Sequence, residues 1–203
     1  MSGAARLAAL GTATVAEAAS QARPLPAPLR PVGHGMRVAG PARTVRSRPG
    51  DNLALHHAIA AALPGDVIVA DYGGSCDSGP FGEIMALACK LRGIAGLVID
   101  GAVRDSAEIA AMGFPVFARG LDIRGTTKRD RGEIDTALEI GGVRISPGDM
   151  IVADADAVIV LPAAAAGAAL AAAEARAAGE ARMMERLRAG ETTLQILGLD
   201  RPD

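Results

Sequence analysis

Three charged residues stand at the ends of predicted elements, where they could bind a metal ion and an organic acid. Glu83 follows a glycine-rich loop, and Arg104 and Asp105 come directly after a short apolar run. Carboxylates are hard oxygen ligands suited to Mg2+ or Mn2+, and arginine offers a planar fork of donors for a carboxylate. A divalent cation beside an arginine could therefore bind a 2-oxo acid and stabilise its enolate as a Lewis acid.

The same residues also have ordinary structural explanations. An Arg-Asp pair after a strand is often a salt bridge or a helix cap, and an acid in the first turn of a helix interacts favourably with the helix dipole. Cys76 lies in the glycine-rich loop with no histidine tied to it by sequence, and neither Lys90 nor Lys128 stands at a strand end. No Walker or GxGxxG motif is present, so we expect no nucleotide cofactor.

A strand–helix–strand unit is predicted to position the charged residues. Asp66–Asp71 and Ala95–Asp100 are short apolar runs, typical of strands buried on both faces. Phe81–Arg92 lies between them and has helical periodicity. So short a unit implies parallel strands and a right-handed crossover. The apolar stripe expected to pack on the sheet consists of Ile84, Leu87, Ala88 and Leu91.

This topology brings the candidate residues to one edge of the sheet. Ligands of open α/β sheets bind beyond the carboxyl ends of the parallel strands, so Glu83 should meet Arg104 and Asp105 although 20 residues separate it from the arginine. The helix should begin near Gly82, whose lack of a side chain allows a ligand close to the backbone. The free N–H groups of the first turn would form an anion site.

The remaining segments are predicted to form the structural framework around the site. Thr14–Glu17 fits a capping box that opens a short first helix, and Met36–Gly40 and Ala42–Arg46 fit two strand pieces around a Gly-Pro turn. Leu121–Glu133 is polar, as expected of a solvated loop, or of a lid or subunit contact. A long C-terminal helix is predicted from Pro162 to about Ala189, where it could contact another subunit or pack on its own sheet.

Two adjacent histidines and the overall composition argue against several classes of site and partner. His56 and His57 should point to different faces of one helix, so both cannot easily bind one ion. The chain has 203 residues and a net charge of -2, without the basic footprint of a nucleic-acid binder. Its two cysteines favour a reducing cytoplasm over a disulfide framework. We expect neither a signal peptide nor a membrane span.

Several motifs spread along the chain carry a resemblance to a known family. They are Pro49–Asn52 (PGDN), Gly65–Val69 (GDVIV), Gly82–Met85 (GEIM), Gly96–Asp105 (GLVIDGAVRD), Gly113–Phe117 (GFPVF) and Ala189–Thr193 (AGETT). With them the sequence resembles the RraA-like family. That family includes the divalent-metal-dependent 4-hydroxy-4-methyl-2-oxoglutarate and 4-carboxy-4-hydroxy-2-oxoadipate aldolases, and also the regulator of ribonuclease E activity.

The resemblance implies a fold and an activity. The fold would be a single-domain RraA-like α/β sandwich over residues 1–203, with a βαβ core and a long C-terminal helix, assembled as a trimer or as a hexamer of two trimers. The activity would be that of a class II pyruvate aldolase, which cleaves a 4-hydroxy-2-oxo acid through a metal-stabilised pyruvate enolate. Oxaloacetate decarboxylation passes through the same enolate and is an expected side activity.

The resemblance also implies a role for each site residue. Glu83, Arg104-Asp105 and Glu108 match the spacing of the family's aldolases. Asp105 would ligate the Mg2+ or Mn2+ ion directly, and Glu83 would hold metal-bound water. Arg104 and the backbone of Gly82, Glu83, Ile84 and Met85 would hold the pyruvoyl part of the substrate. The acid donor would come from water or from a neighbouring subunit.

Two rival functions follow from the same resemblance. The ribonuclease-regulator branch typically lacks the aspartate after the arginine, so Asp105 favours an enzyme over a regulatory protein that binds a ribonuclease. The segment Cys76–Pro80 departs from the family pattern and would border the substrate. A related lyase or hydrolase that acts on a different acid is therefore the third interpretation.

Overall fold

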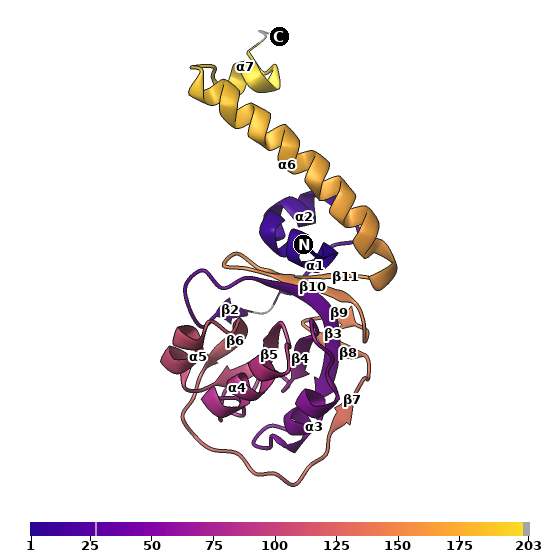
Figure 1. The fold of residues 1–203 in the computed structure, drawn as a ribbon, viewed down its shortest axis with the longest axis vertical. Coiled ribbons are helices and arrows are strands. Elements are labelled where there is room, and N and C mark those ends of the chain that lie inside the picture. Colours follow the sequence, from indigo (N-terminus) through magenta and orange to yellow (C-terminus); the bar gives the residue numbers. More distant parts are fainter. Residues whose placement is uncertain (27, 201–203) are drawn as a thin grey trace.

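Four parallel strands form the centre of the fold, in the order β3 (Val38–Arg46), β4 (Val67–Asp71), β5 (Gly96–Val103) and β6 (Val116–Leu121). The computed structural model describes residues 1–26 and 28–200, and Figure 1 shows these strands side by side. All eight residues of β5 are buried, as expected of a strand covered on both faces. The predicted βαβ unit and the α/β fold are confirmed.

Shorter strands extend this sheet at both edges, so that the described residues form a nine-stranded sheet and a separate hairpin. On one side, β10 pairs antiparallel with β3, and β11 and then β1 follow; on the other side, β2 pairs with β6. The hairpin consists of β8 (Leu138–Ile140) and β9 (Val143–Ile145), and β8 contacts β3 and β4. The bounds are β1 Arg23–Pro24, β2 Arg30–Pro31, β7 Glu133–Ile134, β8 Leu138–Ile140, β9 Val143–Ile145, β10 Met150–Ala153 and β11 Val158–Leu161.

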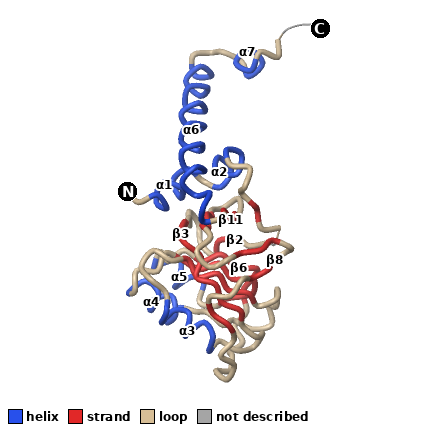
Figure 2. Tube along the Cα trace, turned by 90° about the vertical axis from the view of Figure 1, so that its right-hand side faces the viewer, coloured by secondary structure: helices blue, strands red, loops and turns tan. Residues whose placement is uncertain are grey.

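The helices fall into two groups. Figure 1 shows α3, α4 and α5 together beside the parallel strands, and Figure 2 shows them on one side of the sheet. The other group, α1, α2 and the first half of α6, packs near β10 and β11. The bounds are α1 Gly3–Leu10, α2 Thr12–Ala18, α3 Leu53–Ala61, α4 Glu83–Leu91, α5 Ser106–Met112, α6 Ala166–Arg188 and α7 Thr193–Leu197.

Each group of helices has its own apolar core. The larger cluster joins the parallel strands to α3, α4, α5 and the hairpin, and it includes Tyr72, Phe81 and Phe117. The smaller one lies between the terminal helices and β10–β11; it is built largely from small residues such as Ala169 and Ala173 of α6. Small side chains let α6 approach the sheet and the N-terminal helices closely.

The second half of α6 leaves the body of the molecule as an arm. The helix is 23 residues long, which corresponds to roughly 35 Å at 1.5 Å per residue. Helix α6 contacts α1 and α2 as far along as Glu180, which accepts a hydrogen bond from Thr14. Both views show its C-terminal part projecting with α7 at its end (Figures 1 and 2). Thr192 caps α7. Within the described residues, we find no helix that could cross a membrane.

The two strand pieces predicted around Gly40-Pro41 are one strand, so this expectation was wrong. The first half of β3 pairs with β10 and the second half pairs with β4. Pro41 lies near the change of partner, where a residue without an N–H group is tolerated. Gly40 is required there, because a Cβ would collide with the carbonyl oxygen of Gly65.

The apolar stripe predicted for α4 was assigned to the wrong face. Ile84 and Leu91 are 83% and 79% exposed, whereas Met85, Ala86 and Cys89 are the residues that pack inward. The helix is apolar on both faces, so periodicity alone could not decide which face meets the sheet. The helix also begins at Glu83 rather than at the predicted Phe81.

The predicted capping box at Thr14 was also wrong, because a carboxylate far along the chain caps the helix instead. Helix α2 begins at Thr12, whose backbone N–H and hydroxyl donate to Asp154 at 2.8 and 2.6 Å. Burial raises the pKa of Asp154, but these bonds and those from Asp156 and Ala157 outweigh it and lower the pKa below its usual value. Asp154 therefore ties the N-terminal helices to the turn between β10 and β11.

We predict that Asp154→Ala destabilises the protein by about 1 kcal/mol, because a helix loses its cap. Because the pKa of Asp154 is lower in the folded state, its stabilisation is fully present above the unfolded-state pKa. The stabilisation is lost as the pH falls from the unfolded-state pKa through the folded-state pKa. Urea unfolding at pH 7 and pH 3 should show a difference between wild type and variant that shrinks at pH 3. Asp156→Asn, two residues away and exposed, is the control; an equal loss in this variant would contradict the assignment.

Candidate active site

All of the predicted site residues except Glu83 line one pocket at the carboxyl end of the parallel strands. The pocket has a volume of about 180 Å³. It lies where β4 leads through the glycine-rich loop into α4 and where β5 leads into α5. The lining residues are Asn52, His56, Pro80, Gly82, Ile84, Met85, Arg104, Asp105 and Lys128. The structure thus brings Gly82, Ile84, Met85, Arg104 and Asp105 together, as the topology predicted.

Asp105 is held in an unusual backbone conformation. It lies in the left-handed region at φ 55° and ψ 40°, directly before α5. Its Oδ2 accepts a hydrogen bond from the backbone N–H of Glu83 at 3.0 Å and lies 3.7 Å from Nε of Arg104. A residue other than glycine in this region costs on the order of 1 kcal/mol, and such strain concentrates at functional sites. The side chain is 40% exposed and open to a ligand.

Gly82 provides the space that Asp105 occupies. A Cβ at this position would collide with Oδ2 of Asp105 and would lie 3.1 Å from Nε of Arg104. Its φ of -148° is accessible to any residue, so the requirement for glycine comes from the contact and not from backbone strain. The GEIM motif therefore places the start of α4 directly against the Arg-Asp pair.

The start of α4 supplies the second part of the site. Gly82 is the N-cap and provides no side-chain cap. The N–H of Glu83 is taken by Asp105, while Ile84 and Met85 line the pocket. First-turn amides have no partner within the helix, and together with the helix dipole they favour a bound anion. A carboxylate could thus bind between the helix and Arg104.

The two glutamates are placed differently from Asp105. Glu83 contacts Asp105 through its backbone, but its exposed side chain is not among the residues that line the pocket. Glu108 is exposed in the first turn of α5. The role of Glu83 in holding metal-bound water stays a prediction, as do the roles of the other site residues.

The donor set of this pocket suits a weakly ligated hard cation. Among the described residues, no group of three or more His, Cys, Asp and Glu comes together as a metal cluster. A zinc site would need three or four such ligands. Mg2+, by contrast, keeps several waters and binds proteins through one or two carboxylates. The partly exposed Asp105 is compatible with such an ion.

Three residues that sequence reasoning did not assign to the site complete the pocket wall. Asn52 donates from Nδ2 to the carbonyl oxygen of Pro80 at 2.9 Å, while its Oδ1 is buried without a partner among the described residues. A buried acceptor of this kind calls for a donor from a ligand or from water. His56 lies one helical turn after Asn52, and Lys128 approaches from the loop before β7.

Sequence signals for these residues were present but ambiguous. Asn52 and His56 have the i, i+4 spacing of side chains on one helix face. Lys128 is one of only two lysines, and it was set aside because it does not stand at a strand end. Burial, followed by the charges of Lys128 and His57, lowers the pKa of His56 below its usual 6.5. The lowered pKa therefore favours the neutral form of His56 at pH 7.

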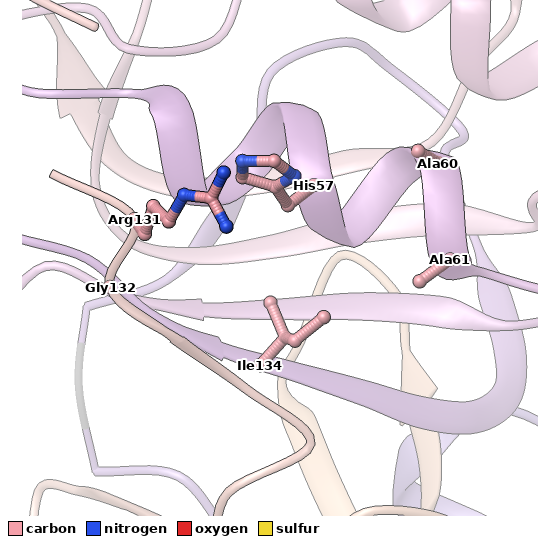
Figure 3. Close-up of a pocket in the computed structure, with 6 residues that line it drawn as sticks. All are labelled: His57, Ala60, Ala61, Arg131, Gly132 and Ile134. Carbon is pink, nitrogen blue, oxygen red and sulfur yellow. The ribbon is translucent and has the colours of Figure 1, made fainter. Parts of the chain in front are cut away.

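The adjacent His57 faces a different, larger pocket, which confirms that the two histidines point apart. This open pocket of about 470 Å³ is lined by His57, Ala60, Ala61, Arg131, Gly132 and Ile134. Figure 3 shows the side chain of Arg131 reaching towards His57, with Ile134 lying nearer the alanines. The residues that line it include no carboxylate, so this pocket offers a hard cation no carboxylate ligand.

The segment Cys76–Pro80 borders the site only at its end. Of these five residues, Pro80 alone is among those that line the pocket. Asp77 approaches Arg124 at 3.6 Å on the surface. Gly79 donates from its N–H to the carbonyl oxygen of Arg124 at 2.9 Å. A Cβ on Gly79 would collide with Asp122, so the segment is closely packed against the loop after β6.

Known proteins are similar to this chain in sequence and in fold. A protein from Halalkalibacterium halodurans named "Putative 4-hydroxy-4-methyl-2-oxoglutarate aldolase" is 42% identical over 151 residues, which is 74% of this chain and 72% of that one. A solved RNA-processing inhibitor RraA from Thermus thermophilis is 30% identical and has a TM-score of 0.70, with 74% of this chain and 92% of that chain covered.

A third similar protein covers the terminal helices as well. It is an uncharacterized protein from Pseudomonas syringae pv. tomato, with a TM-score of 0.85 and 29% identity over 95% of both chains. The model of the RraA-like family, described as Aldolase/RraA, matches residues 12–160. On this match and on the 42% identity to the first relative, the chain belongs to the RraA-like family.

Proposed function

We propose that the protein is a class II pyruvate aldolase that cleaves a 4-hydroxy-2-oxo acid. The observation that carries the proposal is the strained Asp105 beside Arg104 and the first turn of α4, in one pocket. Relatives named as 4-hydroxy-4-methyl-2-oxoglutarate aldolases support a carbon–carbon lyase. The substrate class and the metal are part of the proposal.

In this mechanism, Arg104 and the α4 amides bind the carboxylate and the 2-oxo oxygen of the substrate. A divalent cation held by Asp105, Mg2+ or Mn2+, would supply Lewis-acid polarisation of the 2-oxo group. Cleavage breaks the bond between C3 and C4, and its electron pair forms the enolate of pyruvate. Arg104 stabilises the charge that develops on the enolate oxygen.

Proton transfers complete the reaction. The 4-hydroxyl proton leaves as the C4 carbonyl forms, and a proton then adds to C3 of the enolate to give pyruvate. The neutral His56 lines the pocket and can accept a proton at pH 7. The acid that protonates C3 would be water or a group from a neighbouring subunit. Oxaloacetate decarboxylation forms the same enolate and would be a side activity.

Two rival functions remain distinct from this proposal. A regulatory protein that binds a ribonuclease is suggested by the Thermus protein, which is described as an RNA-processing inhibitor. What favours an enzyme over a regulator is the place of Asp105 beside Arg104 in the pocket, since Asp135 has the same φ of 55° without lining the pocket. A related lyase or hydrolase that acts on another acid is suggested by the Cys76–Pro80 segment, and a panel of 2-oxo acids would distinguish it.

We also propose an oligomer that works in a reducing cytoplasm. The described cysteines, Cys76 and Cys89, are both free. A trimer, or a hexamer of two trimers, would cover apolar side chains that one chain leaves exposed. These are Met183, Met184 and Leu187 on the arm, Leu194 and Leu197 on α7, and Ile84, Leu87 and Leu91 on α4. The α4 face adjoins the pocket, so a neighbouring subunit could reach the substrate.

Purified protein should release pyruvate from oxaloacetate only with Mg2+ or Mn2+, and EDTA should abolish the activity. Asp105→Ala should lower kcat/KM by roughly 10²-fold or more, because the cation loses its protein ligand. A coupled lactate dehydrogenase assay measures the release, with Asp156→Asn as the control. A metal-independent wild type, or a fully active Asp105→Ala, would overturn the aldolase proposal.

Gly82→Ala should abolish most of this activity while the protein stays folded. The added Cβ collides with Asp105 and crowds Arg104, but both side chains lie at an exposed site where they can move. We expect at least a tenfold loss of kcat/KM and a melting temperature within a few degrees of wild type. Gly167→Ala in α6, where a Cβ meets open space, should retain full activity; an active Gly82→Ala would refute the close packing inferred here.

A double variant, Met183→Glu with Leu187→Glu, should weaken the assembly, because it places charge on the apolar side of the arm. Light scattering after size exclusion should show the mass falling towards the 20.5 kDa of one chain. Ala178 is exposed and nine residues before Leu187, about half a turn away around the helix. Ala178→Glu is therefore the control and should keep the wild-type mass. An unchanged mass of the double variant would exclude the arm from the interface.

A further inference from the structure

The loop between β6 and β7 carries a cationic side chain to the pocket without regular structure of its own. Residues 122–132 contain no helix and no named strand, and most of them are exposed. Lys128 nevertheless lines the pocket with Asn52 and His56 of the α3 region. Apolar packing cannot fix so exposed a segment, so other interactions must determine where Lys128 lies.

One buried carboxylate accepts hydrogen bonds from the residues on both sides of Lys128. Asp51 is 3% exposed. Its Oδ2 accepts from the hydroxyl of Thr127 at 2.5 Å and from the backbone N–H of Arg129 at 2.7 Å. Its Oδ1 accepts from the N–H of Leu53, at the start of α3, at 2.9 Å. A single side chain therefore joins both neighbours of Lys128 to the helix that carries His56.

Further hydrogen bonds to the backbone support the contacts of Asp51 and connect this region to the sheet. The N–H of Asn52 donates to the carbonyl oxygen of Thr127 at 3.0 Å, and the N–H of Thr127 donates to that of Gly50 at 2.9 Å. The hydroxyl of the buried Tyr72, just after β4, donates to the carbonyl oxygen of Asp51 at 2.9 Å. The loop, α3 and the end of β4 thus meet at Asp51.

The charge of Asp51 makes it suited to this role. Burial raises the pKa of Asp51, but hydrogen bonds from Thr127, Leu53 and Arg129 outweigh burial and lower the pKa to about 2. The carboxylate is therefore ionised at neutral pH, and both of its oxygens accept hydrogen bonds. An asparagine of the same shape would present an NH2 group to at least one of these donors.

A purely structural role is the alternative. The bond from Leu53 to Asp51 resembles an ordinary helix cap, and a cap alone would affect stability without affecting ligand binding. Two of the three side-chain bonds, however, reach residues 76 and 78 positions later in the chain. They flank the one residue of this loop that lines the pocket. A helix cap does not explain this arrangement.

We propose that Asp51 is a positioning residue that holds Lys128 in the pocket, where its ammonium group binds a second anionic group of a ligand whose 2-oxo acid group is bound at Arg104. The pocket would then offer two cationic side chains, Arg104 for the 2-oxo acid end of the ligand and Lys128 for its second carboxylate. The inference rests on the proposed function only in requiring that a 2-oxo acid binds here.

The test compares two ligands that differ at the far end. Pyruvate has only the 2-oxo acid group, whereas 2-oxoglutarate carries a second carboxylate. Calorimetry in the presence of Mg2+ should show that wild type prefers 2-oxoglutarate and that Lys128→Ala lowers this preference about tenfold. Asp51→Asn should lower it similarly, and Thr127→Val about threefold, with pyruvate affinity unchanged within twofold. Asp156→Asn should change neither affinity.

A double variant and hydrogen exchange separate positioning from general destabilisation. If Asp51 acts through Lys128, then Asp51→Asn with Lys128→Ala should have the preference of Lys128→Ala alone. Asp51→Asn and Thr127→Val should also speed amide exchange in residues 122–132 while leaving β4 and β5 protected. Further loss in the double variant, or unchanged exchange in the loop, would overturn the positioning role.

The outcomes also distinguish this inference from the proposed function. If both acids bind wild type but the preference survives in Asp51→Asn and Lys128→Ala, the present inference is wrong and the proposed function stands. If neither acid binds wild type in the presence of Mg2+, the proposed function is wrong, and the ligand-binding role of Lys128 is overturned with it.

Discussion

The hydrogen bond from the Glu83 amide to Asp105 is the interaction on which the site depends. It joins the start of α4 to the end of β5, two points that the parallel register of β4 and β5 brings to one edge. Gly82 makes it possible, since any side chain there would displace the carboxylate. The same bond takes up one of the free amides of α4 and orients one oxygen of Asp105, so the proposed anion site at α4 and the proposed metal ligand are positioned together.

The parts of the fold that could be predicted from sequence are those with one dominant physical cause. Asp66–Asp71 and Ala95–Asp100 are short and carry charge only at their ends, which predicts buried strands, and the short crossover predicts that they are parallel. This was enough to bring Arg104 and Asp105 to Gly82. The roles of these residues as ligands came from the family resemblance, because spacing alone does not distinguish a metal ligand from a helix cap.

The errors arose where two physical solutions compete. Helix α4 has an apolar face on both sides, and the faces of Ile84 and Met85 differ in burial only because one meets the sheet. The N–H groups of α2 needed a cap, but Asp154 provides it from 142 residues away, and no local motif can show this. Lys128 was missed for the same reason, since it follows no strand end and its neighbours Thr127 and Arg129 are bonded to Asp51, 76 and 78 residues earlier in the chain.

The shared fold of aldolases and a ribonuclease regulator raises the question of which feature separates them. The sheet, the two cores and the arm would serve either function, because they determine only the shape. The pocket region has three features that cost stability: Asp105 at φ 55°, a conformation shared by Asp135, a buried oxygen of Asn52 without a partner among the described residues, and a buried, ionised Asp51 bonded to both neighbours of Lys128. Each of these reduces stability or requires compensation by specific hydrogen bonds. Their occurrence around one small pocket is explained most simply by the binding of a ligand that supplies the missing partners.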